Sequence, residues 1–166
     1  RNSPSQARKN ISAHYDLGND FYQGFLDEKM LYSSAWYQEP QMTLEQAQEA
    51  KMRRLCEQLQ LKAGDHLLEI GTGWGAMAEF AAREYGCQVT TTTISREQYR
   101  FACERIEKAG LSDRVTVLFE DYRSLQGQFD KLVSIEMIEA VGKRYLSTFF
   151  KRCNALLKPH GRMAIQ

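Results

Sequence analysis

The chain of 166 residues lacks the features of a membrane-spanning or nucleic-acid-binding protein. No signal peptide is visible in this sequence, and it has no run of about eighteen apolar residues, the length that a helix needs to cross a bilayer. Its 22 Lys and Arg residues nearly balance 21 Asp and Glu residues, which argues against nucleic acid because phosphate binding needs an excess of cations. A chain of this size, without repeats or low-complexity segments, forms one hydrophobic core.

Cysteine and histidine are too few and too scattered to indicate a metal site or a disulfide framework. Cys56, Cys87, Cys103 and Cys153 lie far apart, with no C-x-x-C pair and no histidine at a spacing suited to zinc. We therefore expect no metal, and reduced thiols packed within helices and strands, as in a cytosolic protein.

From residue 61 onward, strand-like and helix-like segments alternate. Apolar and β-branched runs predict five strands, at residues 67–70, 89–93, 115–119, 132–135 and 162–166. Amphipathic segments predict helices from residue 76 to a left-handed cap at Gly86, from Ser95 to about residue 108, and from about 145 to 157. Residues 158–161 contain a proline and a glycine and are expected to stop the last helix. This alternation predicts a doubly wound, largely parallel α/β sheet with helices on both faces.

We divide the chain into residues 1–60, an N-terminal helical lid or arm, and residues 61–166, the core. Thr43 and Gln46 have the spacing of a capping box, which predicts a helix beginning there. The aromatic-rich segment before it fits either a lid over an apolar ligand or the packing of an amphipathic arm. Because a sheet that stops at its fifth strand leaves an open edge, we expect a fragment whose C-terminal part is absent.

A glycine-rich loop follows the first predicted strand. Residues 67–75 read L-L-E-I-G-T-G-W-G, so an acid lies two residues before three alternating glycines. Glycine permits a positive φ and lets a ligand lie directly against the backbone at the carboxyl end of the strand. The spacing is not the dinucleotide pattern G-x-G-x-x-G. It resembles the first motif of class I S-adenosylmethionine (SAM) dependent methyltransferases, which have a Rossmann-like fold.

Several segments together resemble the cyclopropane-fatty-acyl-phospholipid synthase family, which includes the mycolic-acid cyclopropane synthases. The matching segments are residues 13–22, 32–35, 69–75, 110–115, 121–123 and 133–142. The resemblance implies SAM as cofactor and methyl transfer to a cis double bond in the acyl chain of a membrane phospholipid, which forms a cyclopropane. It also implies a bound bicarbonate as base, a cytoplasmic location at the inner membrane surface and a possible homodimer.

The resemblance implies a set of cofactor-binding residues: Tyr32, Ser33, Glu69, Gly71, Thr72, Gly73, Trp74, Gly75, Thr93, Gln98, Asp121, Tyr122 and Arg123. Gln98 has two interpretations, because it matches a ribose-side residue and also completes a capping box with Ser95. Tyr122 is expected to pack on the adenine ring, and Asp121 to accept from its amino group.

The catalytic residues implied by the resemblance surround the bicarbonate. Glu139 matches the glutamate that holds this anion, together with the backbone of Ile135, and Glu136 is placed to share a helical face with Glu139. Two positions depart from the family. Ser34 replaces a cysteine, and Gln166 replaces a histidine whose proton relay an amide cannot reproduce. These changes leave open a methyl- or methylene-branched product in place of ring closure, or a non-catalytic relative that binds SAM or lipid. A small-molecule methyltransferase on the same fold is a further alternative.

Overall fold

The computed structural model describes residues 3–15 and 18–166 of the chain, without the side chains of residues 4, 8 and 12–15. Asp16 and Leu17, which belong to the segment 13–22 of the family resemblance, lie outside the described residues. No helix among the described residues is long and apolar enough to span a membrane.

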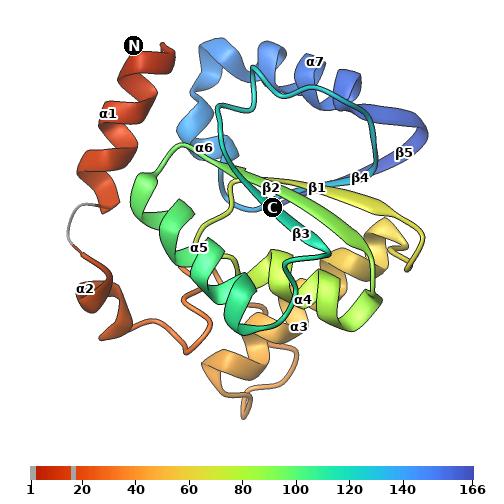
Figure 1. Cartoon of the computed structure of the whole chain (residues 1–166). Helices are drawn as coiled ribbons and strands as arrows, with labels where there is room; N and C mark the ends of the chain where they lie inside the picture. Colours follow the sequence, from red (N-terminus) through yellow and green to blue (C-terminus); the bar gives the residue numbers. More distant parts are fainter. Residues whose placement is uncertain (1–2, 16–17) are drawn as a thin grey trace.

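A single five-stranded parallel sheet forms the centre of the molecule (Figure 1). Its strands are β1 (His66–Ile70), β2 (Gln88–Thr93), β3 (Val115–Phe119), β4 (Phe129–Ser134) and β5 (Leu157–Ile165). They lie in the order β3-β2-β1-β4-β5, and every neighbouring pair is parallel. The chain therefore runs outward from β1 in one direction and returns to build the other half. This reversal between β1 and β4 is where open α/β sheets bind ligands.

Helices cover both faces of the sheet, as the alternating sequence predicts (Figure 1). The helices α3 (Leu44–Leu59), α4 (Ala76–Tyr85) and α5 (Arg96–Lys108) cover one face, and α6 (Ile138–Val141) and α7 (Leu146–Leu156) cover the other. Successive side chains of β1 alternate between the two cores: Leu67 packs with Met52 and Phe80, whereas Leu68 packs with Phe149. The predicted doubly wound architecture is confirmed.

The ends of several helices follow the sequence signals. Thr43 and Gln46 form the predicted capping box of α3, in which each side chain accepts from the other residue's backbone N–H. Gly86 ends α4 with φ of 66°. The four cysteines are free, and Cys56, Cys87 and Cys153 are buried. Burial raises the pKa of the Cys56 thiol to about 12.

The last strand differs from its predicted bounds. It begins at Leu157 rather than at residue 162, and the pairing with β4 shifts between Phe129 and Lys131. Residues 158–161 are therefore accommodated as an irregularity within β5, with His160 at φ of 65°. Leu157 keeps one pairing with β4 before the bulge, which a signal based on proline and glycine does not reveal.

The N-terminal segment lies beside the sheet rather than in it. Its helices α1 (Pro4–Tyr15) and α2 (Asn19–Gln23) are joined to α3 by an irregular segment (Figure 1). Tyr22 and Met30 pack with Trp74 of the glycine loop in a small separate core. The division at residue 60 stays a prediction, although α1 contributes to the cavity described next.

Candidate functional site

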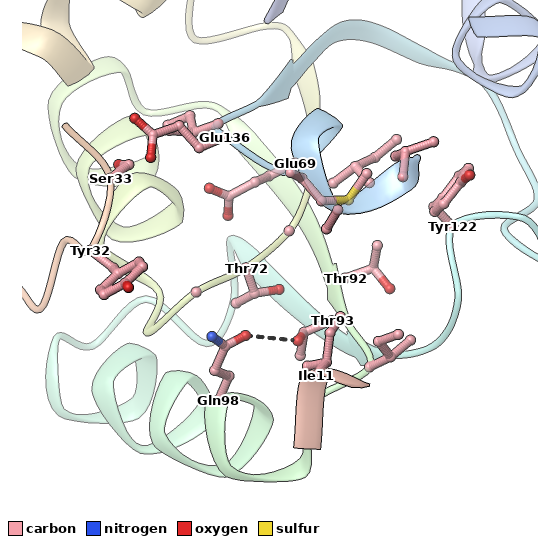
Figure 2. Close-up of a pocket in the computed structure, with 18 of the residues that line it drawn as sticks. Ile11, Tyr32, Ser33, Glu69, Thr72, Thr92, Thr93, Gln98, Tyr122 and Glu136 are labelled. Carbon is pink, nitrogen blue, oxygen red and sulfur yellow. Dashed lines mark hydrogen bonds between the residues drawn. The ribbon is translucent and has the colours of Figure 1, made fainter. Parts of the chain in front are cut away.

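A cavity of about 600 Å³ lies at the carboxyl ends of the central strands. Its walls come from α1, residues 30–33, the glycine loop, the end of β2, residues 120–123 and residues 135–141. Figure 2 shows Glu136 and Ser33 at one end of the pocket, Tyr122 at the other and Glu69 between them. This volume falls within the range of about 300–1,000 Å³ that small-molecule sites occupy.

The glycine loop presents bare backbone to this cavity. Gly71 and Gly73 adopt φ of 100° and 53°, and a Cβ on Gly73 would meet no atom within 4 Å. The backbone N–H groups of Gly71 and Thr72 both donate to the carbonyl oxygen of Thr92, at 3.0 and 3.1 Å, which fixes the loop to β2. The loop is rigid at its first two residues and open to a ligand at the third.

Gly75 has a different role from the other two glycines. It caps α4 with φ of 89°, and a Cβ there would lie 3.2 Å from the Cβ of Ala102 on α5. Gly75 is absent from the residues that line the cavity. The structure therefore places Gly75 in the packing of α4 against α5. Its contact with the cofactor stays a prediction.

Glu69 is a buried acid at the end of β1, with only 2% of its surface exposed. Its Oε1 accepts a hydrogen bond of 2.7 Å from Thr91, whose hydroxyl also pairs with that of Thr72 at 2.7 Å. Burial raises the pKa of Glu69 to about 8, and the bond from Thr91 lowers it only in part. The carboxyl faces the cavity, so a cationic ligand group would favour its ionised form (Figure 2).

Gln98 takes part in both arrangements: it completes half of a capping box and it lines the cavity, while its contact with a ribose stays a prediction. Ser95 caps α5 by accepting from the backbone N–H of Gln98 at 3.3 Å. The Gln98 side chain does not return to the Ser95 backbone, because its Oε1 accepts from Thr93 Oγ1 at 3.1 Å, and the Ser95 N–H donates to that same Thr93 hydroxyl (Figure 2). Only half of the capping box forms, and Thr93 and Gln98 both line the cavity.

Residues 121–123 form a tight ionic unit after β3. The carboxylate of Asp121 accepts from Arg123 Nε at 2.9 Å and from its terminal nitrogen at 2.7 Å. This pairing raises the pKa of Arg123. Tyr122 packs edge-on against Phe149, with ring centroids 5.4 Å apart, and also lines the cavity. The expected adenine-side residues are thus held together at one end of the site.

At the opposite end, α3 fixes the segment that carries Tyr32, Ser33 and Ser34. Lys51 is only 4% exposed, and its Nζ donates to Ser33 Oγ at 2.6 Å and to the Ser34 carbonyl oxygen at 2.9 Å. Gln48 adds a bond of 2.8 Å to the Ser33 carbonyl oxygen. Burial lowers the pKa of Lys51 to about 8, against the opposing charges of Glu136 and Asp27.

Ser34 and Gln166 both donate hydrogen bonds to one carboxylate oxygen of Glu136. We call these three residues the Glu136 cluster. Oε1 of Glu136 accepts from the Ser34 N–H at 2.8 Å, from Ser34 Oγ at 2.7 Å and from Gln166 Nε2 at 3.1 Å. Partial burial alone raises the pKa of Glu136, but these bonds and the charge of Lys51 bring it below the usual value. The carboxylate is therefore an anion at neutral pH.

The predicted catalytic residues are only partly brought together. Ile135, Glu136 and Glu139 line the cavity, whereas Ser34 and Gln166 reach it through Glu136. Glu139 is exposed and takes no part in the bonds that join the cluster. The expectation that Glu136 and Glu139 share a helical face is wrong, because Glu136 precedes α6 and has φ of 51°. The catalytic role of Glu139 stays a prediction.

Sequence reasoning missed Lys51 and Gln48. Both fall on the face of α3 that also carries Leu55 and Leu59 in the core. Polar residues at core-facing positions of an amphipathic helix were the available signal, since buried polar side chains need partners. Their partners, the Ser33 hydroxyl and backbone carbonyls of the irregular segment before α3, cannot be found by helical spacing.

The fold and the site together define a class of protein. A doubly wound parallel sheet, a G-x-G-x-G loop after β1 and a cavity at the carboxyl ends of the strands are the architecture of class I SAM-dependent methyltransferases. Residues 2–166 match the family described as mycolic acid cyclopropane synthetase, and the chain belongs to that family.

Individual relatives agree with this assignment. The chain is 47% identical over 148 residues to the cyclopropane-fatty-acyl-phospholipid synthase of Escherichia coli K12, covering 89% of this chain and 37% of that protein. It is 45% identical over 153 residues to a probable fatty acid methyltransferase of Pseudomonas putida, covering 91% and 39%. The solved structure of the mycolic acid cyclopropane synthase CmaA1 with SAH and CTAB superimposes with a TM-score of 0.90 at 32% identity, covering 95% and 55%. The chain thus spans well under half the length of these two sequence relatives.

Proposed function

We propose that this chain forms the cofactor-binding and catalytic part of an enzyme that transfers a methyl group from SAM to the cis double bond of an unsaturated phospholipid acyl chain and closes a cyclopropane ring. The observation that carries this proposal is one cavity lined by the glycine loop, by Glu69 and by the anionic Glu136. A methyl cation donor and a proton acceptor would then act on one substrate between them. The family match and the relative from Escherichia coli support the same chemistry.

The residues of the cavity fit SAM. Gly73 leaves backbone open, and the buried carboxyl of Glu69 lies where a cationic ligand would offset the free energy lost by burying its charge. SAM carries two cationic groups, the ammonium and the sulfonium, and its product SAH is bound in the related CmaA1 structure. Tyr32 and Ser33 would hold the carboxylate end, and Thr93 and Gln98 the ribose.

At the adenine end, Tyr122 would pack against the ring. Both oxygens of Asp121 already accept from Arg123, so an adenine amino group would share this carboxylate with the guanidinium. Arg123 then fixes the direction of Asp121 rather than contacting the base. This arrangement supports a positioned acceptor, because the bidentate pair leaves the carboxylate little rotational freedom.

The remaining wall suits an acyl chain. Apolar side chains that line the cavity include Ile11, Leu31, Ile135, Met137 and Val141. Such a wall excludes water and would protect a carbocation on the chain from hydration. We propose that the lipid comes from a membrane surface on the cytoplasmic side. The exposed aromatic rings of Phe21 and Phe25 are suited to an interfacial position there. A homodimer remains a prediction.

When bound, SAM supplies an electrophilic methyl group, which the π pair of the alkene takes while sulfur keeps the electrons of the broken S–C bond. The side chains around the cavity then have three tasks: they hold the alkene, exclude water and accept one proton. The second candidate product, a methyl- or methylene-branched chain, would arise when the proton leaves from a neighbouring carbon. The altered anion site and the methyltransferase from Pseudomonas putida favour retaining it as a candidate.

The test uses the full-length protein, SAM with a labelled methyl group and vesicles of unsaturated phospholipid, with mass spectrometry of the released fatty acids. We expect a gain of one CH₂ that resists hydrogenation, which identifies a cyclopropane. A gain that hydrogenates to a branched chain would establish the second product. Binding of SAM without any labelled lipid would refute both lipid activities and favour a small-molecule methyltransferase.

A further inference from the structure

The anion site expected for bicarbonate is filled by a carboxylate of this chain. The backbone N–H and the hydroxyl of Ser34, together with the amide of Gln166, all donate to Oε1 of Glu136 within 2.7–3.1 Å. Ser34 and Gln166 occupy two of the positions that the family resemblance assigns to the bicarbonate site, beside Glu139 and the backbone of Ile135. A second anion on the same donors would displace Glu136 or lie against its negative charge. The residues present therefore do not fit bicarbonate.

The backbone holds Glu136 in this place. Its φ of 51° lies in the left-handed region, which is unfavourable for a residue with a side chain. The Glu136 N–H donates to the Gln166 carbonyl oxygen at 2.8 Å, and the Gln166 N–H donates to the Ser134 carbonyl oxygen at 3.1 Å. The ends of β4 and β5 thus fix the backbone conformation in which Glu136 lines the cavity and its carboxylate meets Ser34 and Gln166.

The hydrogen bonds to Glu136 and the nearby charge of Lys51 keep its carboxylate anionic. Lys51 is buried, donates to Ser33 and Ser34, and supplies a positive charge that acts on Glu136. Asp27 balances part of the Lys51 charge. It lies in the segment before Leu31 and accepts from the Leu31 backbone N–H. One carboxylate oxygen carries the three hydrogen bonds, so the group is fixed while it still lines the cavity.

Resting on the proposed function, we propose that Glu136 is the catalytic base of this enzyme and that the reaction proceeds without bicarbonate. After methyl transfer the acyl chain carries a carbocation. Glu136 takes a proton from the transferred methyl group, and the electron pair of that C–H bond forms the last C–C bond of the ring. The products are a neutral cyclopropane and a protonated Glu136, which returns its proton to solvent. A carboxylate is a strong enough base, because a C–H bond of a methyl group one carbon away from a cationic centre is far more acidic than a carboxylic acid.

The test compares the full-length wild type with Glu136→Gln and Glu136→Gly in CO₂-depleted buffer, with and without added bicarbonate. Glu107→Gln, an exposed glutamate on α5, is the matched control. We expect wild-type activity to change less than twofold with bicarbonate, and Glu136→Gln to lower kcat by about 100-fold or more, the range of general-base catalysis. SAH affinity, measured by calorimetry, should change less than twofold in Glu136→Gln, because its carboxylate is the base and not a cofactor ligand.

Glu136→Gly gives the second, independent readout. Glycine adopts a positive φ without strain, so this variant should fold, and it frees the donors of Ser34 and Gln166. We expect bicarbonate to bind this variant, which broadening of the ¹³C-bicarbonate NMR signal would detect. Added bicarbonate should raise the activity of Glu136→Gly at least tenfold.

Bicarbonate binding to the wild type, or a wild type that needs bicarbonate, would overturn the proposal, as would a fully active Glu136→Gln. Absence of any lipid product from the wild type would instead refute the proposed function.

Discussion

The pKa values of two acids in the cavity, Glu69 and Glu136, are shifted in opposite directions by their surroundings. Glu69 has one hydroxyl partner and almost no solvent, and burial raises its pKa to about 8. Glu136 has three donors on one oxygen and a nearby lysine, and its pKa falls below the usual value. Such a separation assigns different tasks to chemically identical groups. Glu69 is ready to ionise against an arriving cation, whereas Glu136 is already a proton acceptor.

Glu69→Gln should make stability less dependent on pH. Because the folded-state pKa of Glu69 is about 8 and its ordinary value 4.5, the unfolded state ionises first as pH rises. The wild type therefore loses stability between pH 4.5 and 8, by on the order of 1.4 kcal/mol for each pKa unit. The Glu69→Gln variant keeps the hydrogen bond from Thr91 and lacks this loss. Its free energy of unfolding in urea should therefore rise relative to that of the wild type between pH 5 and pH 8.

The same substitution should weaken SAM binding, by about 10-fold or more at pH 8, because the amide carries no charge for the ligand cation. In the wild type, affinity should rise with pH until Glu69 ionises near pH 8. Equal affinities of the two proteins at pH 8, measured by calorimetry, would contradict a role for Glu69 at the cofactor.

At the scale of elements, the glycine loop combines ligand access with helix packing. Gly73 opens the backbone to the cavity, whereas Gly75 lets α4 approach α5. The atoms of Ala102 lie 3.2 and 3.3 Å from where a Cβ of residue 75 would be. Such contacts are tighter than ordinary van der Waals distances, so a single methyl group there would move one helix or the other.

Gly75→Ala should destabilise the protein by about 2–4 kcal/mol, from left-handed strain and overpacking together. Gly110→Ala is the matched control, because Gly110 also has a positive φ, of 67°, but open space around it. It should cost only about 1 kcal/mol. Urea unfolding of both variants measures the difference. Equal losses would show that backbone strain, rather than the contact with Ala102, makes glycine necessary at position 75.

The order of strands and helices followed from local signals: apolar runs, the capping residues Thr43 and Ser95, and the cap glycine Gly86. Positions in the candidate site could be predicted from the sequence only for residues on these elements, such as Glu69 on β1. Helical spacing wrongly grouped Glu136 with Glu139, because the left-handed turn at Glu136 depends on backbone bonds to Gln166, thirty residues later in the chain. Such long-range bonds leave no periodic signal in the sequence.

At the scale of the whole molecule, one arginine connects the N-terminal arm to the core. Arg105 of α5 donates to the Lys29 carbonyl oxygen at 2.7 Å and to the Trp74 carbonyl oxygen at 3.1 Å. Its Nε pairs with Glu79 at 2.7 Å. Trp74 in turn donates to Asn19 of α2 at 3.0 Å. The arm, the glycine loop and two helices thus share a single bonded group, so the arm and the cofactor loop should be ordered together.

Arg105→Gln should loosen the arm and the loop in concert. Hydrogen bonds to a charged donor contribute about 1.5–3 kcal/mol each, and the shorter amide cannot bridge both carbonyls. We expect faster proteolytic cleavage within residues 18–43 and a SAH affinity lowered by about 5- to 20-fold, with cleavage slowed again by saturating SAH. Arg100→Gln, an exposed arginine on the same helix, should change neither property. Faster cleavage with unchanged SAH affinity would show that the arm moves independently of the glycine loop. The coupling requires both to change, because Trp74 belongs to the loop and packs against the arm.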